Sequence, residues 1–204
     1  MARYGISRKK TYGVSIPNLR RLARELGKDH SLAQELWSSG VHEARILASM
    51  IDDPEDVTED QMENWARAFD SWDVCDQCCN NLFSRTRFAY QKAEEWSAAE
   101  GEYVKRAGFV LMATLAVHDK VALDEVFTRF LPMIMRESDD GRNFVKKAVN
   151  WALRQIGKRN RVLNEKALET AGQIERKKSS SARWIGKDAM KELRSEAVHR
   201  RLPD

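Results

Sequence analysis

The sequence contains few residues that interrupt helices and no clear pattern of strands. Only four of its 204 residues are proline and ten are glycine. Most of them lie between segments of helical periodicity, as Gly13 and Pro17 do before a helix. Ser15 with Pro17 indicates one helix start, and Thr58 with Gln61 indicates a capping box at another. Period-two alternation with β-branched residues is absent, so the sequence predicts an all-α protein.

Cysteine is also scarce. Cys75, Cys78 and Cys79 are the three cysteines of the chain, and they lie within five residues of one another. An odd, clustered set is a poor disulfide framework and is typical of a reducing cytoplasm. A structural zinc site needs four Cys or His ligands, and His42 and His118 are the nearest histidines in sequence. We therefore expect buried thiols on a helix, and neither a metal site nor a cofactor.

Long apolar runs are missing as well. None approaches the ~20 residues that a membrane span needs, and the N-terminal residues lack the apolar region of a signal peptide. The sequence therefore predicts a cytoplasmic protein without a membrane partner.

Charge is unevenly distributed: residues 1–100 hold 13 basic and 17 acidic residues, and residues 101–204 hold 22 basic and 14 acidic residues. A basic half favours a polyanionic partner, although many proteins have such an imbalance without one.

The stretch 142–161 has seven basic residues and no acidic one. On a helix, one face is apolar and consists of Val145, Ala148, Val149, Ala152 and Ile156. The opposite face consists of Lys147, Trp151, Arg154, Lys158 and Arg161. Cations bind phosphates, and an exposed tryptophan offers a flat surface to a sugar or a base. The alternative is a solvated basic face with Trp151 packed on a neighbouring helix.

Helices in this sequence recur in pairs, with a period of about 30 to 40 residues that is typical of helical solenoids. We expect the second helix of each pair to begin near His42, Trp72, Tyr103, Asn143 and Ser181. This predicts one domain over residues 1–204, a right-handed stack of about five HEAT-like antiparallel helix pairs. A basic residue recurs near these helix starts, at Arg45, Arg106, Lys147 and Arg183. These cations either line one concave surface or act as spacers on a solvated face.

The helix expected from Tyr103 to His118 is apolar almost all round after Lys105 and Arg106. Such a helix is buried in the middle of an array. We expect its two cations to emerge at the rim of the concave surface.

Trp72 and Asp76 lie four residues apart and therefore share one face of a helix. Both lie beside the apolar stripe that contains Val74, Cys75 and Cys78. A carboxylate repels phosphates, so in a phosphate-binding surface it indicates a specific task, such as holding a water or stabilising developing positive charge. The alternative is a structural ion pair between Asp76 and Arg106.

These segments resemble the AlkD family of DNA glycosylases, HEAT-like repeat proteins that remove alkylated bases. The resemblance extends over nearly the whole chain, and it rests mainly on HEARILA at 42–48, SWDVCD at 71–76, VKRAGF at 104–109 and FVKKAVNWALR at 144–154. It implies that Asp76 is the catalytic carboxylate and that Trp72 and Trp151 contact the deoxyribose of the damaged nucleotide. It also implies that Arg106 holds DNA in the active site, and that the base need not be flipped into a deep pocket.

The chemistry that the resemblance implies needs few groups. An N3- or N7-alkylated purine is already cationic, so its glycosidic bond is weak and the leaving base needs no proton. One carboxylate and two aromatic faces can stabilise an oxocarbenium-like sugar and place a water. We therefore expect a monomeric, monofunctional alkylpurine DNA glycosylase of base-excision repair that acts on double-stranded DNA and associates with the nucleoid. The expected DNA-binding side chains are Arg45, Lys105, Lys146, Lys147, Arg154, Lys158, Arg159, Arg183 and Lys187.

Two alternatives remain. One is a non-catalytic repeat protein that binds distorted or branched DNA, and release of a methylated base separates it from the glycosylase. The other is a protein-binding scaffold without a nucleic-acid partner, which a DNA-binding assay at several salt concentrations excludes or supports.

Overall fold

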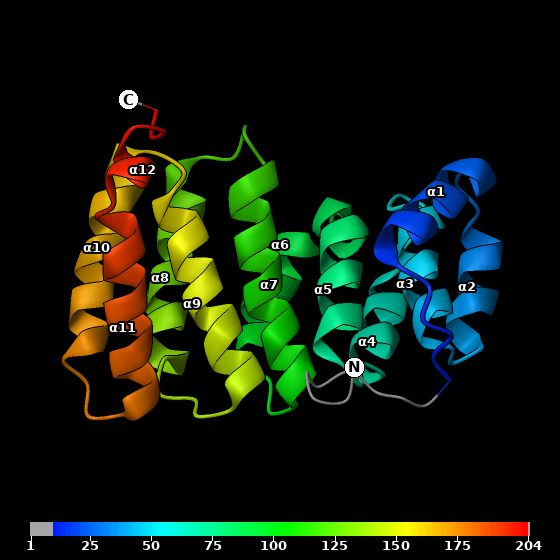
Figure 1. Cartoon of the computed structure of the whole chain (residues 1–204), viewed down its shortest axis with the longest axis horizontal. Helices are drawn as coiled ribbons and strands as arrows, with labels where there is room; N and C mark the ends of the chain where they lie inside the picture. Colours follow the sequence, from blue (N-terminus) through cyan, green and yellow to red (C-terminus); the bar gives the residue numbers. More distant parts are fainter. Residues whose placement is uncertain (1–9, 204) are drawn as a thin grey trace. The chain divides into compact units, whose positions relative to one another are not determined.

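The computed structural model describes residues 10–203, and within them every regular element is a helix (Figure 1). The chain divides into two compact units, residues 1–89 and 90–204. The first unit contains α1 (Ile16–Leu26), α2 (His30–Ser38), α3 (His42–Ile51), α4 (Glu59–Arg67), α5 (Trp72–Asn81) and the 3-10 helix η2 (Phe83–Arg85). The second contains α6 (Ala89–Ser97, which begins at the boundary), α7 (Glu102–His118), α8 (Asp124–Glu137), α9 (Asn143–Gly157), α10 (Arg161–Glu175), α11 (Ser180–Leu193) and α12 (Glu196–His199).

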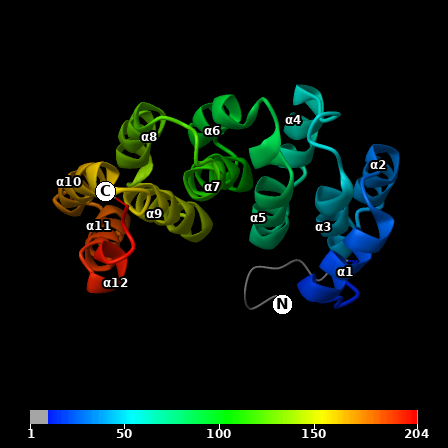
Figure 2. The ribbon, with the colours of Figure 1, turned by 90° about the horizontal axis from the view of Figure 1, so that it is seen from above.

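The first unit has two layers. Helices α1, α3 and α5 form one row, and α2 and α4 lie behind it (Figure 2). Aromatic rings pack α2 against α4: Trp37 of α2 and Trp65 of α4 stack with ring centroids 4.0 Å apart, and Phe69 and Phe83, which flank α5, lie against them. Stacked rings bury large apolar areas, so this cluster fixes the layer that carries α5.

The second unit repeats the arrangement, with α7, α9 and α11 in one row and α6, α8 and α10 in the other (Figure 2). Helix α7 is buried continuously from Arg106 to Ala116, as its apolar sequence predicts. It packs on α9, which in turn contacts α10 and α11. Among residues 10–203, none of the helices combines the length and apolarity that a bilayer crossing requires.

The predicted helix starts are confirmed. The second helices of the pairs begin at His42, Trp72, Glu102, Asn143 and Ser180, each within one residue of its expected position. The architecture of stacked helix pairs can therefore be predicted from the sequence. The single domain over residues 1–204 and the handedness of its stack stay predictions.

Two local expectations need correction. The basic stretch 142–161 is not one helix, because α9 ends at Gly157, Lys158 is its C-cap and Arg161 begins α10. The capping box at α4 is half formed. The Thr58 hydroxyl accepts from Gln61 N at 3.1 Å, but the Gln61 amide donates to Asp52 at 2.6 Å and does not return to the cap.

Candidate functional site

Trp72 and Asp76 lie on α5, which begins at Trp72 after the N-cap Ser71. The buried side of the helix holds Val74, Cys75, Cys78 and Cys79, all with 0% exposure, as the sequence predicts for the thiols. Trp72 and Asp76 are half-buried and lie one turn apart beside this stripe. Helix α5 therefore presents an aromatic ring and a carboxylate at its partly solvated side.

A buried histidine anchors the start of α5. His42 of α3 is 8% exposed, and its Nε2 lies 2.9 Å from Oδ2 of Asp73. This hydrogen bond raises the pKa of His42 above its ordinary value, although burial opposes the shift. Burial raises the pKa of Asp73, but the hydrogen bond and charge of His42, together with hydrogen bonds from Ser71 and Val74 N, outweigh it and leave the pKa below its usual range. The pair holds Trp72, the neighbour of Asp73, in place.

The sequence analysis missed this pair, although the sequence contains a signal for it. His42 and Asp73 are the first residue of α3 and the second residue of α5, 31 residues apart. That separation is one period of the repeat, and residues one period apart in stacked helices face each other.

The basic residues on α3 and α7 are held by the protein. Arg45 is partly buried: its Nη1 donates to Ala68 O at 3.3 Å, and its guanidinium carbon lies 5.1 Å from the centre of the Trp37 ring. Arg106 is 6% exposed and donates to Phe144 O at 2.6 Å. The expectation that Arg106 emerges at a rim is therefore wrong, because the start of α9 covers it.

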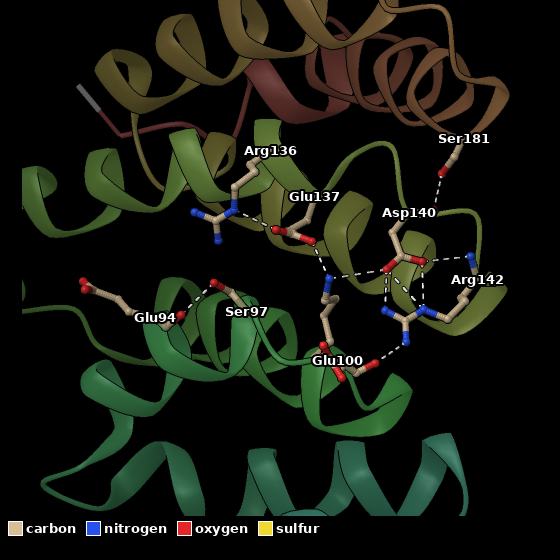
Figure 3. Close-up of polar contacts among 9 residues, drawn as sticks. Glu94, Ser97, Glu100, Arg136, Glu137, Asp140, Arg142 and Ser181 are labelled. Carbon is tan, nitrogen blue, oxygen red and sulfur yellow. Dashed lines mark hydrogen bonds and ion pairs between the residues drawn. The ribbon is translucent and has the colours of Figure 1, made fainter.

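Lys105 lies between the carboxylate of Glu137, the last residue of α8, and that of Asp140 in the segment that joins α8 to α9. Its ammonium pairs with Glu137 and with Asp140, the latter at 3.6 Å (Figure 3). Burial raises the pKa of Glu137, yet hydrogen bonds from Arg136 and Lys105 outweigh it and hold the pKa low. The Arg142 guanidinium likewise keeps the pKa of Asp140 below its usual range. Lys105 is therefore compensated within the protein and is not exposed at the rim.

Helix α9 has the two faces that its sequence predicts. Val145, Ala148, Val149, Ala152 and Ile156 are fully buried. On the other face Lys147 is exposed and Trp151 is half-buried. Arg154 and Lys158 both pair with Glu192 of α11, Lys158 at 2.7 Å. Only part of this basic face is therefore free to take a ligand.

Arg159 lies in the connection between α9 and α10 and points into the protein. Its guanidinium donates to the carbonyl oxygens of Ala116, Asp119 and Ala122 and lies 4.0 Å from the centre of the Phe127 ring. These contacts join the end of α7 and the loop that follows it to the connection between α9 and α10. A phosphate contact by Arg159 stays a prediction, and its geometry favours a structural role.

Helix α11 contributes a tryptophan that the sequence analysis did not single out. Trp184 is 40% exposed, and Lys146 of α9 lies over its ring, with Nζ 5.3 Å from the centroid. Arg183 and Lys187 are exposed on the same helix. The signal was available, since Trp184 lies off the stripe Ala182, Ile185, Ala189 and beside basic residues, as Trp151 does on α9.

The structure therefore groups the candidate residues within each unit. Trp72 and Asp76 belong to the first, and Arg106 and Trp151 belong to the second. Their union in a single catalytic site stays a prediction. Among residues 10–203, no group of three or more His, Cys, Asp or Glu side chains is arranged to hold a metal ion.

Comparison with known proteins agrees with this architecture. A sequence model of the family described as DNA alkylation repair enzyme matches residues 1–193. An uncharacterised protein of Listeria innocua is 25% identical over 166 residues, which cover 80% of this chain and 72% of that protein.

A solved structure has the same fold, with a TM-score of 0.76 and 22% identity over 94% of this chain and 86% of its own. It represents a family described as related to the HEAT-like repeat DNA glycosylases with affinity for branched DNA structures.

Proposed function

Because the chain belongs to the DNA alkylation repair enzyme family, we propose that it is a monofunctional glycosylase for cationic N3- and N7-alkylpurines. It acts as a cytoplasmic monomer on double-stranded DNA. The observation that carries the proposal is the pair Trp72 and Asp76, which α5 holds one turn apart at its partly solvated side. The His42–Asp73 hydrogen bond supports the pair by fixing the start of that helix.

In this proposal Asp76 stabilises the positive charge that develops on the sugar as the glycosidic bond breaks, and it positions the attacking water. The Trp72 and Trp151 rings lie against the deoxyribose, where an aromatic face favours a cationic transition state. Arg106 is covered by the start of α9, so in this proposal it orients the DNA indirectly, through the segment that it holds by donating to Phe144 O. No acid is needed, because the alkylated base leaves as a neutral molecule.

The proposed DNA contacts fall into two groups. Lys146, Lys147, Arg183 and Lys187 form no ion pair among the described residues and are available to phosphates. Arg45, Lys105, Arg154, Lys158 and Arg159 already have partners within the protein. We propose that the first group provides most of the salt-dependent affinity, since each phosphate contact contributes about 0.9 to the slope of log K against log salt.

The decisive experiment is single-turnover release of 7-methylguanine from duplex DNA by the wild type and by Asp76→Asn. The variant should lose roughly a hundredfold or more in rate, because one carboxylate near a developing cation in a partly dry site contributes several kcal/mol. Its affinity for DNA should be equal or higher, since a negative charge near the phosphates has been removed. Asp56→Asn is the matched control, because it makes the same charge change at an exposed loop position. Near wild-type excision by Asp76→Asn would make the carboxylate structural.

Lesion charge provides a second test of the same chemistry. Cationic 7-methylguanine and 3-methyladenine should be released, while neutral ethenoadenine and hypoxanthine in the same duplex should not. Efficient release of a neutral base would require a general acid, and the proposed mechanism would then be wrong.

The second candidate function is non-catalytic binding of branched DNA. The solved structure of the same fold favours it, because its family is described as having affinity for such DNA. The outcome that selects this function is the absence of base release together with tighter binding to a four-way junction than to a duplex of equal length.

A further inference from the structure

Helices α9 and α11 run side by side, with contacts at a constant offset of 38 residues. Asn150 donates to Asp188 at 2.6 Å, and Arg154 pairs with Glu192 one turn further along. The preceding turn has the same register, but there Lys146 meets Trp184 where the other turns have an acid. The exposed tryptophan therefore takes the place of a neutralising carboxylate.

Because Trp184 stands where the other turns have an acid, the cations of α9 and α11 are paired with carboxylates in one part of the two helices and unpaired in the other. Towards their C-terminal ends Arg154 and Lys158 are compensated by Glu192, and hydrogen bonds from Lys158 and Arg154 keep the pKa of that carboxyl low although burial opposes them. In the N-terminal half of α9 and α11, Lys147 and Arg183 form no ion pair with any residue from 10 to 203 and are exposed, and the same holds for Lys187 in the middle of α11. Cations that form no ion pair and lie near an exposed aromatic ring repel one another and favour an anionic ligand.

The ring itself narrows the class of ligand. Trp184 is 40% exposed, while Ala182, Ile185 and Ala189 of the same helix are fully buried against the neighbouring helices. Its position is therefore not needed to complete the core. A flat ring beside cations matches a nucleotide, whose base stacks on the ring while its phosphate meets an ammonium. Lys146 lies over the ring on a flexible chain, so its ammonium can move to that phosphate when a base arrives.

We propose that Trp184, with Lys146, Arg183 and Lys187 around it, is a binding site for an unpaired nucleotide of DNA. In an intact duplex both faces of each base are covered by neighbouring bases, so the ring can stack only on a base at a gap, a junction or a single-stranded end. The site adds a preference for interrupted DNA to the contacts made with phosphates. This inference rests on the proposed function insofar as the protein binds DNA, but it does not require base excision.

The test compares binding to an intact duplex and to the same duplex with a four-nucleotide gap, by fluorescence anisotropy at one salt concentration. We expect the wild type to prefer the gapped DNA. Trp184→Leu should reduce that preference roughly 5- to 150-fold, the effect of losing one base–aromatic stack. Trp184→Phe is the matched control, because it keeps a flat ring and should retain most of the preference.

Salt dependence separates stacking from charge. Trp184→Leu removes no charge and should leave the slope of log K against log salt unchanged. Lys187→Gln should lower that slope by about 0.7 on single-stranded DNA, as expected for one lost phosphate contact. The circular dichroism of each variant checks that the exposed substitution leaves the helices intact.

The outcomes distinguish this inference from the proposed function. If Trp184→Leu keeps the full preference for gapped DNA, the nucleotide site is wrong while excision and duplex binding stand. If the wild type binds neither DNA, the proposed function fails as well. Displacement of gapped DNA by polyglutamate at equal charge concentration would also overturn the site, because it would show an acidic peptide to be as good a ligand.

Discussion

Two glycines in neighbouring helices permit a matched test of how the second unit is packed. Gly186 lies in the middle of α11, and Gly172 begins the last turn of α10. A Cβ atom added at Gly186 would lie 2.6 Å from Glu175 N and 2.7 Å from Ala171 O, both backbone atoms. A Cβ added at Gly172 would meet nothing within 4 Å. The same substitution to alanine should therefore have opposite effects at the two positions.

The magnitudes follow from two opposing terms. Alanine in place of glycine stabilises a helix interior by about 1 kcal/mol. At Gly186 the new methyl group forces α10 and α11 apart, and overpacking of this kind costs about 3 kcal/mol at the upper end of its usual range. Backbone atoms cannot rotate away, so we take the upper end. Gly186→Ala should lose about 2 kcal/mol, and Gly172→Ala should gain about 1 kcal/mol.

Thermal unfolding followed by circular dichroism measures the difference. In a chain of this size 1 kcal/mol shifts Tm by roughly 2 to 4 °C, so the two variants should differ by about 6 to 12 °C. A Gly186→Ala protein as stable as Gly172→Ala would show that α10 and α11 do not approach each other at Gly186. Gly172→Ala alone tests the contribution of helix propensity. A loss of stability in that variant would show that the space beside Gly172 is not open.

Three further perturbations test single contacts. His42→Gln should destabilise the protein most between about pH 4 and 6.5 and least above pH 8 in urea titrations. The pKa of His42 is raised in the folded protein, so its contribution to stability is full below its unfolded pKa and is lost as pH rises through the folded pKa. The pKa of Asp73 is lowered, so its contribution is lost as pH falls through the folded value. Equal effects of the substitution at pH 5 and pH 8 would refute the pair. Arg159→Lys should cost about 1 to 3 kcal/mol of unfolding free energy, since a single ammonium nitrogen cannot replace the planar fork whose two nitrogens donate to three separate carbonyl oxygens, and an unchanged urea midpoint would contradict this role. Glu192→Gln should release Lys158 and leave Arg154 with Asp188 alone at 3.7 Å, tighten DNA binding and steepen its salt slope by roughly 1 to 2, whereas weaker binding would place those two cations outside the DNA surface.

The sequence determined the helices and their order. Helical periodicity, Pro17, Ser15 and Thr58 are local signals, and they place the helix starts within one residue because helix formation depends on neighbours three and four positions away. The buried stripe of α9 and the buried thiols of α5 follow from the same periodicity. The repeat period also indicates that His42 and Asp73 face each other, although it was not used to find that pair.

Only the tertiary structure decided which basic side chains are available. Arg45, Arg106, Lys147 and Arg183 occupy equivalent places near helix starts, yet the first two are held against carbonyl oxygens and the last two are exposed. Their local sequences do not distinguish them, because the burial of a long side chain depends on what a helix 30 to 40 residues away places over it. The sequence does indicate that Trp184 lies off the apolar stripe of α11 and beside basic residues, but only the tertiary structure places Lys146 of α9 over its ring.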